Sequence, residues 1–63
     1  MTTFTNIIEA VEYVETAIGS EFSHDYDLEA IAREVTDWQN GKLVLTAEDD
    51  AFWAIVSDHE IVA

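Results

Sequence analysis

Cysteine and proline are both absent from this chain of 63 residues, and only two glycines are present. Without cysteine the chain has neither a disulfide framework nor a thiolate metal site. Since no proline ends a helix or marks a linker, Gly19 and Gly41 are the main signals for the ends of helices and for turns. A chain of this length is expected to form a single small domain, residues 1–63, with a small core and marginal stability.

Basic side chains are scarce. Lys and Arg together number two, against 14 Asp and Glu, which gives a net charge of −12 at neutral pH. Because affinity for phosphates comes mainly from Lys and Arg, Arg33 and Lys42 are too few for direct binding of nucleic acid. A hydrophobic fraction of 49% nevertheless argues against disorder, which combines high net charge with low hydrophobicity. The charge therefore lies on a chain that folds.

Long apolar runs are missing as well. No segment approaches the roughly 18 consecutive apolar residues of a membrane span. The first residues also lack the basic region that begins a secretory signal, and an anionic membrane would repel so acidic a chain. The simplest expectation is a cytoplasmic protein that does not bind membranes.

A first helix is expected over residues 6–18, where apolar residues recur at helical spacing. Thr5 or Asn6 can cap its start, and Gly19 follows at the position where a left-handed residue ends a helix. Beside the apolar stripe, carboxylates spaced i, i+3 and i+6 form a second row, made of Glu9, Glu12 and Glu15. This helix is therefore expected to have one apolar side and one anionic side.

A second helix is expected from Leu28 to about Gly41, with Asp27 as its cap and Trp38 on its apolar face. Arg33 has a carboxylate four residues away on each side. Exposed pairs at this spacing support a helix by about 0.2–0.5 kcal/mol each. Arg33 is therefore interpreted as a helix support rather than as a ligand contact.

A third helix is expected over residues 47–59, with Thr46 as its cap, after a strand-like run at Lys42–Leu45. Residues 60–63 have two alternatives, since they can extend this helix or pair with residues 43–45 as a strand. The expected fold class is mainly α, a compact three-helix domain with a short β element around 42–45. Under the second alternative, residues 60–63 also belong to that β element, and the choice between the two alternatives stays open.

Residues 28–35 have the look of the first helix of a helix-turn-helix unit. The helix that would follow as the recognition helix, however, carries several acidic residues and no Lys or Arg. Such a segment would be repelled by a phosphate backbone. A DNA reader is therefore disfavoured.

No constellation indicates catalysis or a metal site. The acidic loop before Leu28 lacks the Gly and the Glu that a calcium-binding loop needs at their fixed positions. Three consecutive carboxylates, Glu48, Asp49 and Asp50, are expected in the first turn of the third helix, where the helix dipole favours negative charge. His24 and His59 have no nucleophile at a supporting spacing. We therefore expect no enzyme, no metal and no cofactor.

Two aromatic residues are candidates for a partner-binding surface. Trp53 is rotated by about 100° from the apolar face of its helix and is bracketed by acids, and Tyr13 lies beyond the apolar stripe near Glu9. An exposed aromatic ring among carboxylates suits an anchor that meets a basic surface. The alternative is that so small a core needs every large ring for packing.

The negative charge exceeds the net charge of about 2–8 that keeps a small domain soluble. The chain resembles the small acidic proteins of phages and mobile elements that mimic DNA and block restriction or CRISPR nucleases. It shares their small size and their near absence of Lys and Arg. It also has carboxylate-bearing helices, around Glu9, Glu12 and Glu15 and around Glu48, Asp49 and Asp50. The resemblance implies a steric inhibitor without catalysis. Its partner would be a basic, nucleic-acid-binding protein or nuclease.

A second hypothesis is a small protein–protein interaction or assembly module, antitoxin-like or homodimeric, whose acidity serves solubility. The apolar run at residues 43–45 and the apolar tail at residues 61–63 would both benefit from a second chain. The two hypotheses differ in what drives binding. A mimic depends on the carboxylates, whereas an assembly module depends on these apolar segments.

Overall fold

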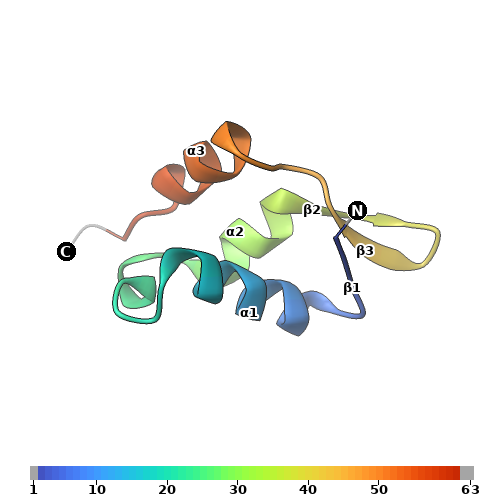
Figure 1. The fold of residues 1–63 in the computed structure, drawn as a ribbon, viewed down its shortest axis with the longest axis horizontal. Coiled ribbons are helices and arrows are strands. Elements are labelled where there is room, and N and C mark those ends of the chain that lie inside the picture. The colour runs from blue at the N-terminus through green and yellow to red at the C-terminus, as the bar shows by residue number, and fades with distance from the viewer. Residues whose placement is uncertain (1, 62–63) are drawn as a thin grey trace.

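The structure is a computed structural model and describes residues 2–61. Over that range the chain runs in the order β1 (Thr3–Phe4), α1 (Ile7–Ile18), a 3-10 turn (Ser23–Asp25), α2 (Leu28–Val35), β2 (Thr36–Gln39), β3 (Lys42–Leu45) and α3 (Asp50–Asp58) (Figure 1). The three helices and the short β element at 42–45 are confirmed. The mainly helical class holds only in part, because that element belongs to a small antiparallel sheet.

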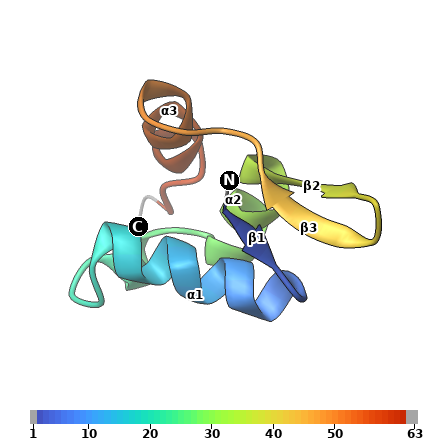
Figure 2. The ribbon, with the colours of Figure 1, turned by 45° about the vertical axis from the view of Figure 1, so that its right-hand side comes forward.

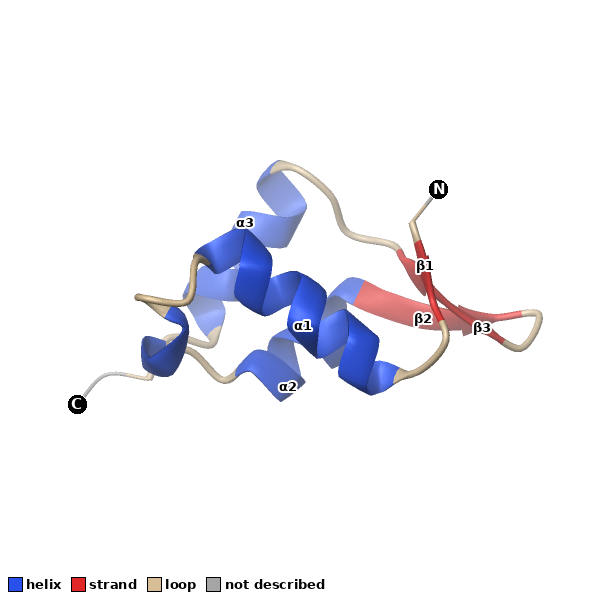
Figure 3. Ribbon diagram, turned by 60° about the horizontal axis from the view of Figure 1, so that its bottom comes forward, coloured by secondary structure: helices blue, strands red, loops and turns tan. Residues whose placement is uncertain are grey.

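The sheet has the strand order β1-β3-β2, so β3 is its central strand. Thr3 lies opposite Val44 in the short β1–β3 pair, and Thr36 lies opposite Leu45 in the β2–β3 hairpin. Figure 2 shows this hairpin projecting beyond the helices. Figure 3 shows the strands gathered at one end of the molecule and the helices at the other.

The second helix is shorter than the periodicity predicts, since it ends at Val35 and not near Gly41. Thr36 is extended, with φ −127° and ψ 161°, and its hydroxyl donates to the carbonyl of Ala32 at 2.6 Å. The chain then enters β2, which places Trp38 on an exposed strand rather than on a helix face. With α2 followed by a strand, the resemblance to the first helix of a helix-turn-helix unit does not extend to its partner helix.

The hairpin turn is Asn40-Gly41, so Gly41 does not end a helix. Both residues have positive φ, 52° and 78°, as the type I′ turn of a two-residue hairpin requires. No heavy atom beyond its chain neighbours lies within 4 Å of the place that a Cβ on Gly41 would take. The glycine is therefore needed for its backbone conformation rather than for space.

The caps of the first two helices agree with expectation. The Asn6 side chain accepts from the Glu9 N–H at 3.0 Å, and Glu9 Oε1 accepts in return from the Thr5 N–H at 2.8 Å. Asp27 caps α2 by accepting from the Ala30 N–H at 3.2 Å. Gly19 ends α1 with φ 100°, and its N–H donates to the Glu15 carbonyl at 2.8 Å.

The third helix also starts later than predicted, at Asp50, and Thr46 is not its cap. The Thr46 N–H and hydroxyl both donate to the carbonyl of Val35, at 2.8 and 3.3 Å. Thr46 therefore joins the end of β3 to the end of α2. At the other end of α3, Glu60 forms a bridge with Tyr26 instead of pairing with β3.

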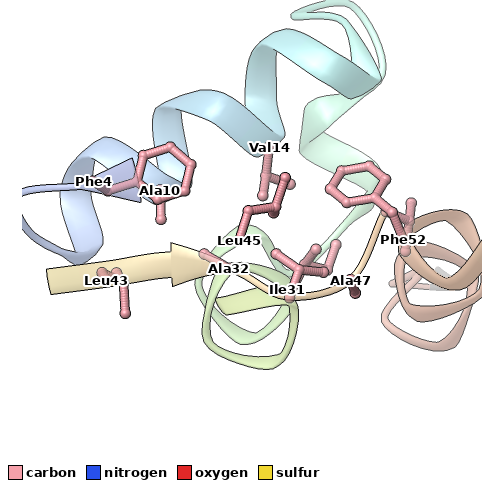
Figure 4. Close-up of a cluster of buried hydrophobic side chains, with 11 residues drawn as sticks. Phe4, Ala10, Val14, Ile31, Ala32, Leu43, Leu45, Ala47 and Phe52 are labelled. Atoms are coloured by element: carbon pink, nitrogen blue, oxygen red, sulfur yellow. The ribbon is translucent and has the colours of Figure 1, made fainter. Parts of the chain in front are cut away.

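The core lies between α1, α2, the inner side of the sheet and the start of α3. Figure 4 shows Val14 of α1, Ile31 of α2 and Leu45 of β3 converging, with Phe52 of α3 closing one side. Full burial of one such aliphatic side chain contributes about 1.5–3 kcal/mol. Residues 43–45 are buried within this chain, so they offer no apolar surface to a second copy. Residues 62–63, part of the expected apolar tail, lie outside the described residues.

None of the helices in residues 2–61 has the length and apolar character needed to cross a membrane.

Candidate functional site

The three glutamates of α1 are all exposed, but they do not have the same role. Glu9 belongs to the cap of the helix, through its hydrogen bond to the Thr5 N–H. Within residues 2–61, neither Glu12 nor Glu15 has a side-chain hydrogen bond or an ion pair. Glu9 therefore has a structural role in the helix cap, whereas no contact of this kind holds Glu12 or Glu15.

The second group of carboxylates lies where the chain enters α3. Glu48, Asp49 and Asp50 are exposed, and only Asp50 is within the first turn, because the helix begins there. Asp49 has φ 54° and ψ −125°, and its side chain makes no capping hydrogen bond. A non-glycine residue in such a conformation costs about 1–3 kcal/mol. The helix dipole therefore accounts for less of this acidic run than the sequence suggests.

The two candidate aromatic residues are partly exposed and belong to one chain of rings. Tyr13 meets Phe4 at a centroid distance of 5.5 Å and Phe52 at 6.2 Å, and Phe52 meets Trp53 at 5.0 Å, each in an edge-to-face arrangement. Tyr13 is 38% exposed and Trp53 49% exposed. Each ring therefore contributes one side to packing and leaves another side open.

Tyr13 and Trp53 line a common hollow of about 260 Å³, which we call the α1–α3 hollow. It is also lined by Glu48 and Asp49, and by three residues that the sequence analysis did not single out for binding: Ala17, Ala47 and Phe52. Ala17 lies one helical turn after Tyr13, so its spacing could have indicated it. Phe52 and Ala47 can be assigned to the hollow only from the tertiary structure, in which both belong to the buried core.

The remaining predicted site residues do not line this hollow. Glu9, Glu12 and Glu15 lie along α1, and Asp50 lies inside α3. The structure therefore unites four of the eight predicted residues, Tyr13, Trp53, Glu48 and Asp49, around one concave surface.

The basic side chains lie elsewhere. Arg33 pairs with Glu29 at 3.4 Å, and both side chains are exposed, so this pair contributes little. The expected second partner, Asp37, lies in β2 and accepts from the Trp38 N–H at 3.0 Å instead. His59 lies apart from the hollow as well, with its Nε2 atom 2.9 Å from Glu34 Oε2.

Metal-ligating side chains do not converge in the part of the chain that the structure describes, where no group of three or more His, Asp or Glu is placed to hold an ion. A second hollow, of about 430 Å³, lies beside Trp38, Arg33 and Ile7. Comparisons with protein-family models, with curated proteins and with solved structures each find no match.

Proposed function

We propose that this chain is a non-catalytic binding protein whose acidic surface engages a basic, nucleic-acid-binding partner and blocks it as a mimic of DNA or RNA. The observation that carries the proposal is the exposure of Glu12, Glu15 and Glu48 without a basic partner in residues 2–61. Charge of one sign destabilises a compact chain by self-repulsion. A cationic surface on a partner would relieve that repulsion.

The spacing of the carboxylates supports this use. Residues i, i+3 and i+6 of a helix are separated by about 4.5 Å of rise per step, and duplex DNA carries one charge per roughly 1.7 Å of its axis. The row on α1 together with the acids before α3 therefore supplies part of the charge density that a Lys/Arg track is built to meet. Association would be steered electrostatically and would weaken as salt rises.

Competition with nucleic acid tests the proposal. The chain is immobilised, proteins from its native cell are captured and released by a salt step, and each is tested for binding of a labelled DNA or RNA duplex. We expect the chain to displace the duplex, and the double variant Glu12→Lys, Glu15→Lys to lose at least about tenfold in affinity as two charge contacts become repulsive. A single Glu21→Lys change, in the loop after α1, is the control. The proposal would be refuted if the affinity for the partner changed neither with salt nor in the double variant of α1.

A second candidate, the assembly module, is favoured by one observation. Trp38 is 58% exposed and borders the hollow of about 430 Å³, which is the size of a small binding site. Sedimentation of the wild-type chain and of Trp38→Ala distinguishes the two candidates. A dimer that persists at high salt and is lost in Trp38→Ala would favour assembly over mimicry.

A further inference from the structure

We propose that the α1–α3 hollow receives one arginine side chain of the basic partner, held between Tyr13 and Trp53 and paired with Glu48 and Asp49. This inference rests on the proposed function, since it takes the partner to be a basic protein. It adds the residue type that the partner contributes. It also names the place where that residue is seated.

The size of the hollow suits a single side chain. Its volume of about 260 Å³ lies below the roughly 300–1,000 Å³ of small-molecule sites. Phe52, only 5% exposed, and the buried Ala47 form an apolar floor. Such a floor can bury the three methylenes of an arginine stem while the charged head stays near the rim.

The walls of the hollow attract a cation. Aromatic rings bind guanidinium groups over their faces within about 6 Å of the centroid, and arginine is found there more often than lysine. The rings of Phe52 and Trp53 lie at 88° to each other, and those of Tyr13 and Phe52 at 87°. Edge-to-face packing places the edge of one ring against a face of the other, and the partial exposure of Tyr13 and Trp53 leaves part of each side chain free to contact a partner.

The rim of the hollow supplies the opposite charge. Glu48 and Asp49 line it, and no Lys, Arg or His is among the lining residues. Arg33 and His59, which pair with other acids, do not neutralise it. The planar fork of a guanidinium group matches carboxylates through paired hydrogen bonds, which an ammonium group cannot do. The combination of rings and carboxylates therefore favours arginine over lysine.

Arginine is also the residue that such a partner would expose. Proteins that bind DNA use arginine for the commonest specific contact, the paired hydrogen bonds to guanine, as well as for phosphates. Seating that side chain in the hollow would remove it from the nucleic acid. Local recognition would thus add to the general attraction between the two surfaces.

Nuclear magnetic resonance of the 63-residue chain, labelled with ¹⁵N, tests the inference. The probes are three short Gly/Ser peptides that are identical except for two arginines, two lysines or two citrullines. We expect the arginine peptide to shift the indole N–H resonance of Trp53 and to leave that of Trp38 unchanged as an internal reference. The lysine peptide should bind several-fold more weakly, and the uncharged citrulline peptide should produce no shift.

Variants separate the hollow from the general acidity. Trp53→Ala should lower the affinity for the arginine peptide about fivefold or more, given the strength of cation–π contacts. It should also reduce the preference for arginine over lysine. Trp38→Ala is the matched control, because it removes an exposed indole elsewhere. Glu48→Gln, which leaves the aromatic packing intact, should weaken binding as well, so the test stands even if Trp53→Ala fails to fold.

Two outcomes would overturn the inference. Equal affinity for the arginine and lysine peptides would show that the chain recognises only net charge. Unchanged affinity of Glu48→Gln and Trp53→Ala for the arginine peptide would show that the hollow is not the binding site of the arginine side chain. Either result leaves the proposed function standing if the chain still displaces a duplex from its partner. Failure of the displacement assay with intact, arginine-selective peptide binding would instead reject mimicry and keep the hollow as an arginine site.

Discussion

Relief of the backbone strain at Asp49 gives a sharp test of the structure beside the hollow. With φ 54° and ψ −125°, Asp49 has a conformation that glycine adopts freely and that costs other residues about 1–3 kcal/mol. Glycine also raises the entropy of the unfolded chain, which costs about 0.5–1 kcal/mol against alanine. Asp49→Gly should therefore be more stable than Asp49→Ala by about 1 kcal/mol, since both variants lose the same charge.

The neighbouring position provides the control. Asp50 is the first residue of α3, so glycine there has only its entropic cost. Asp50→Gly should be less stable than Asp50→Ala by about 0.5–1 kcal/mol, the reverse of the order at position 49. Urea denaturation followed by far-ultraviolet circular dichroism measures all four variants. A preference for alanine at both positions would refute the strain at Asp49.

The same substitution links stability to binding. Asp49→Gly removes one of the two carboxylates at the rim of the α1–α3 hollow while relaxing the chain. If Asp49 serves the hollow, this variant should gain stability and lose affinity for the arginine peptide. Such opposite changes are common where a strained residue lies at a binding site.

Three further results are expected. Asn6→Ala should lower the free energy of unfolding by about 1 kcal/mol through loss of the α1 cap, whereas Glu12→Gln, which removes no intramolecular bond, should not lower it; denaturant titration compares them, and equal losses would contradict the cap. Gly41→Ala should cost about 1 kcal/mol, because φ is 78° and the alanine gains no contact; a neutral result would contradict the I′ turn. Raising salt from about 0.01 to 1 M shortens the screening length from about 30 to 3 Å, so a chain with a net charge of −12 should melt at a higher temperature. A melting temperature that stays constant or falls as salt rises would show that self-repulsion is unimportant.

Local chemistry made part of the fold predictable. Asn6 and Asp27 can be recognised as caps because an acceptor side chain before an apolar helical stripe satisfies free N–H groups within three residues. The end of α2 was not found, because the apolar spacing continues through Val35 to Trp38. Asn40-Gly41 was the available sign of a hairpin, since both residues tolerate positive φ.

The candidate site divides in the same way. Exposure of the α1 carboxylates follows from helical geometry, and the sequence places Tyr13 at the border of the apolar stripe. That Glu9 is part of a cap could be read from its position three residues after Asn6, as in a capping box. The sequence does not predict the conformation of Asp49, since it depends on the position of the end of β3 relative to the start of α3.

By itself the sequence determined the surplus of negative charge, the existence of three helices and the caps of the first two, because these depend on composition and on residues within about one helical turn of each other. Only the tertiary structure decided that β1 adds to β3 and that Tyr13 shares a hollow with Trp53. Those contacts join distant segments, and their stability comes from shared burial of apolar surface, which no local pattern encodes. The aromatic hollow therefore forms only after Phe52 of α3 meets Tyr13 of α1.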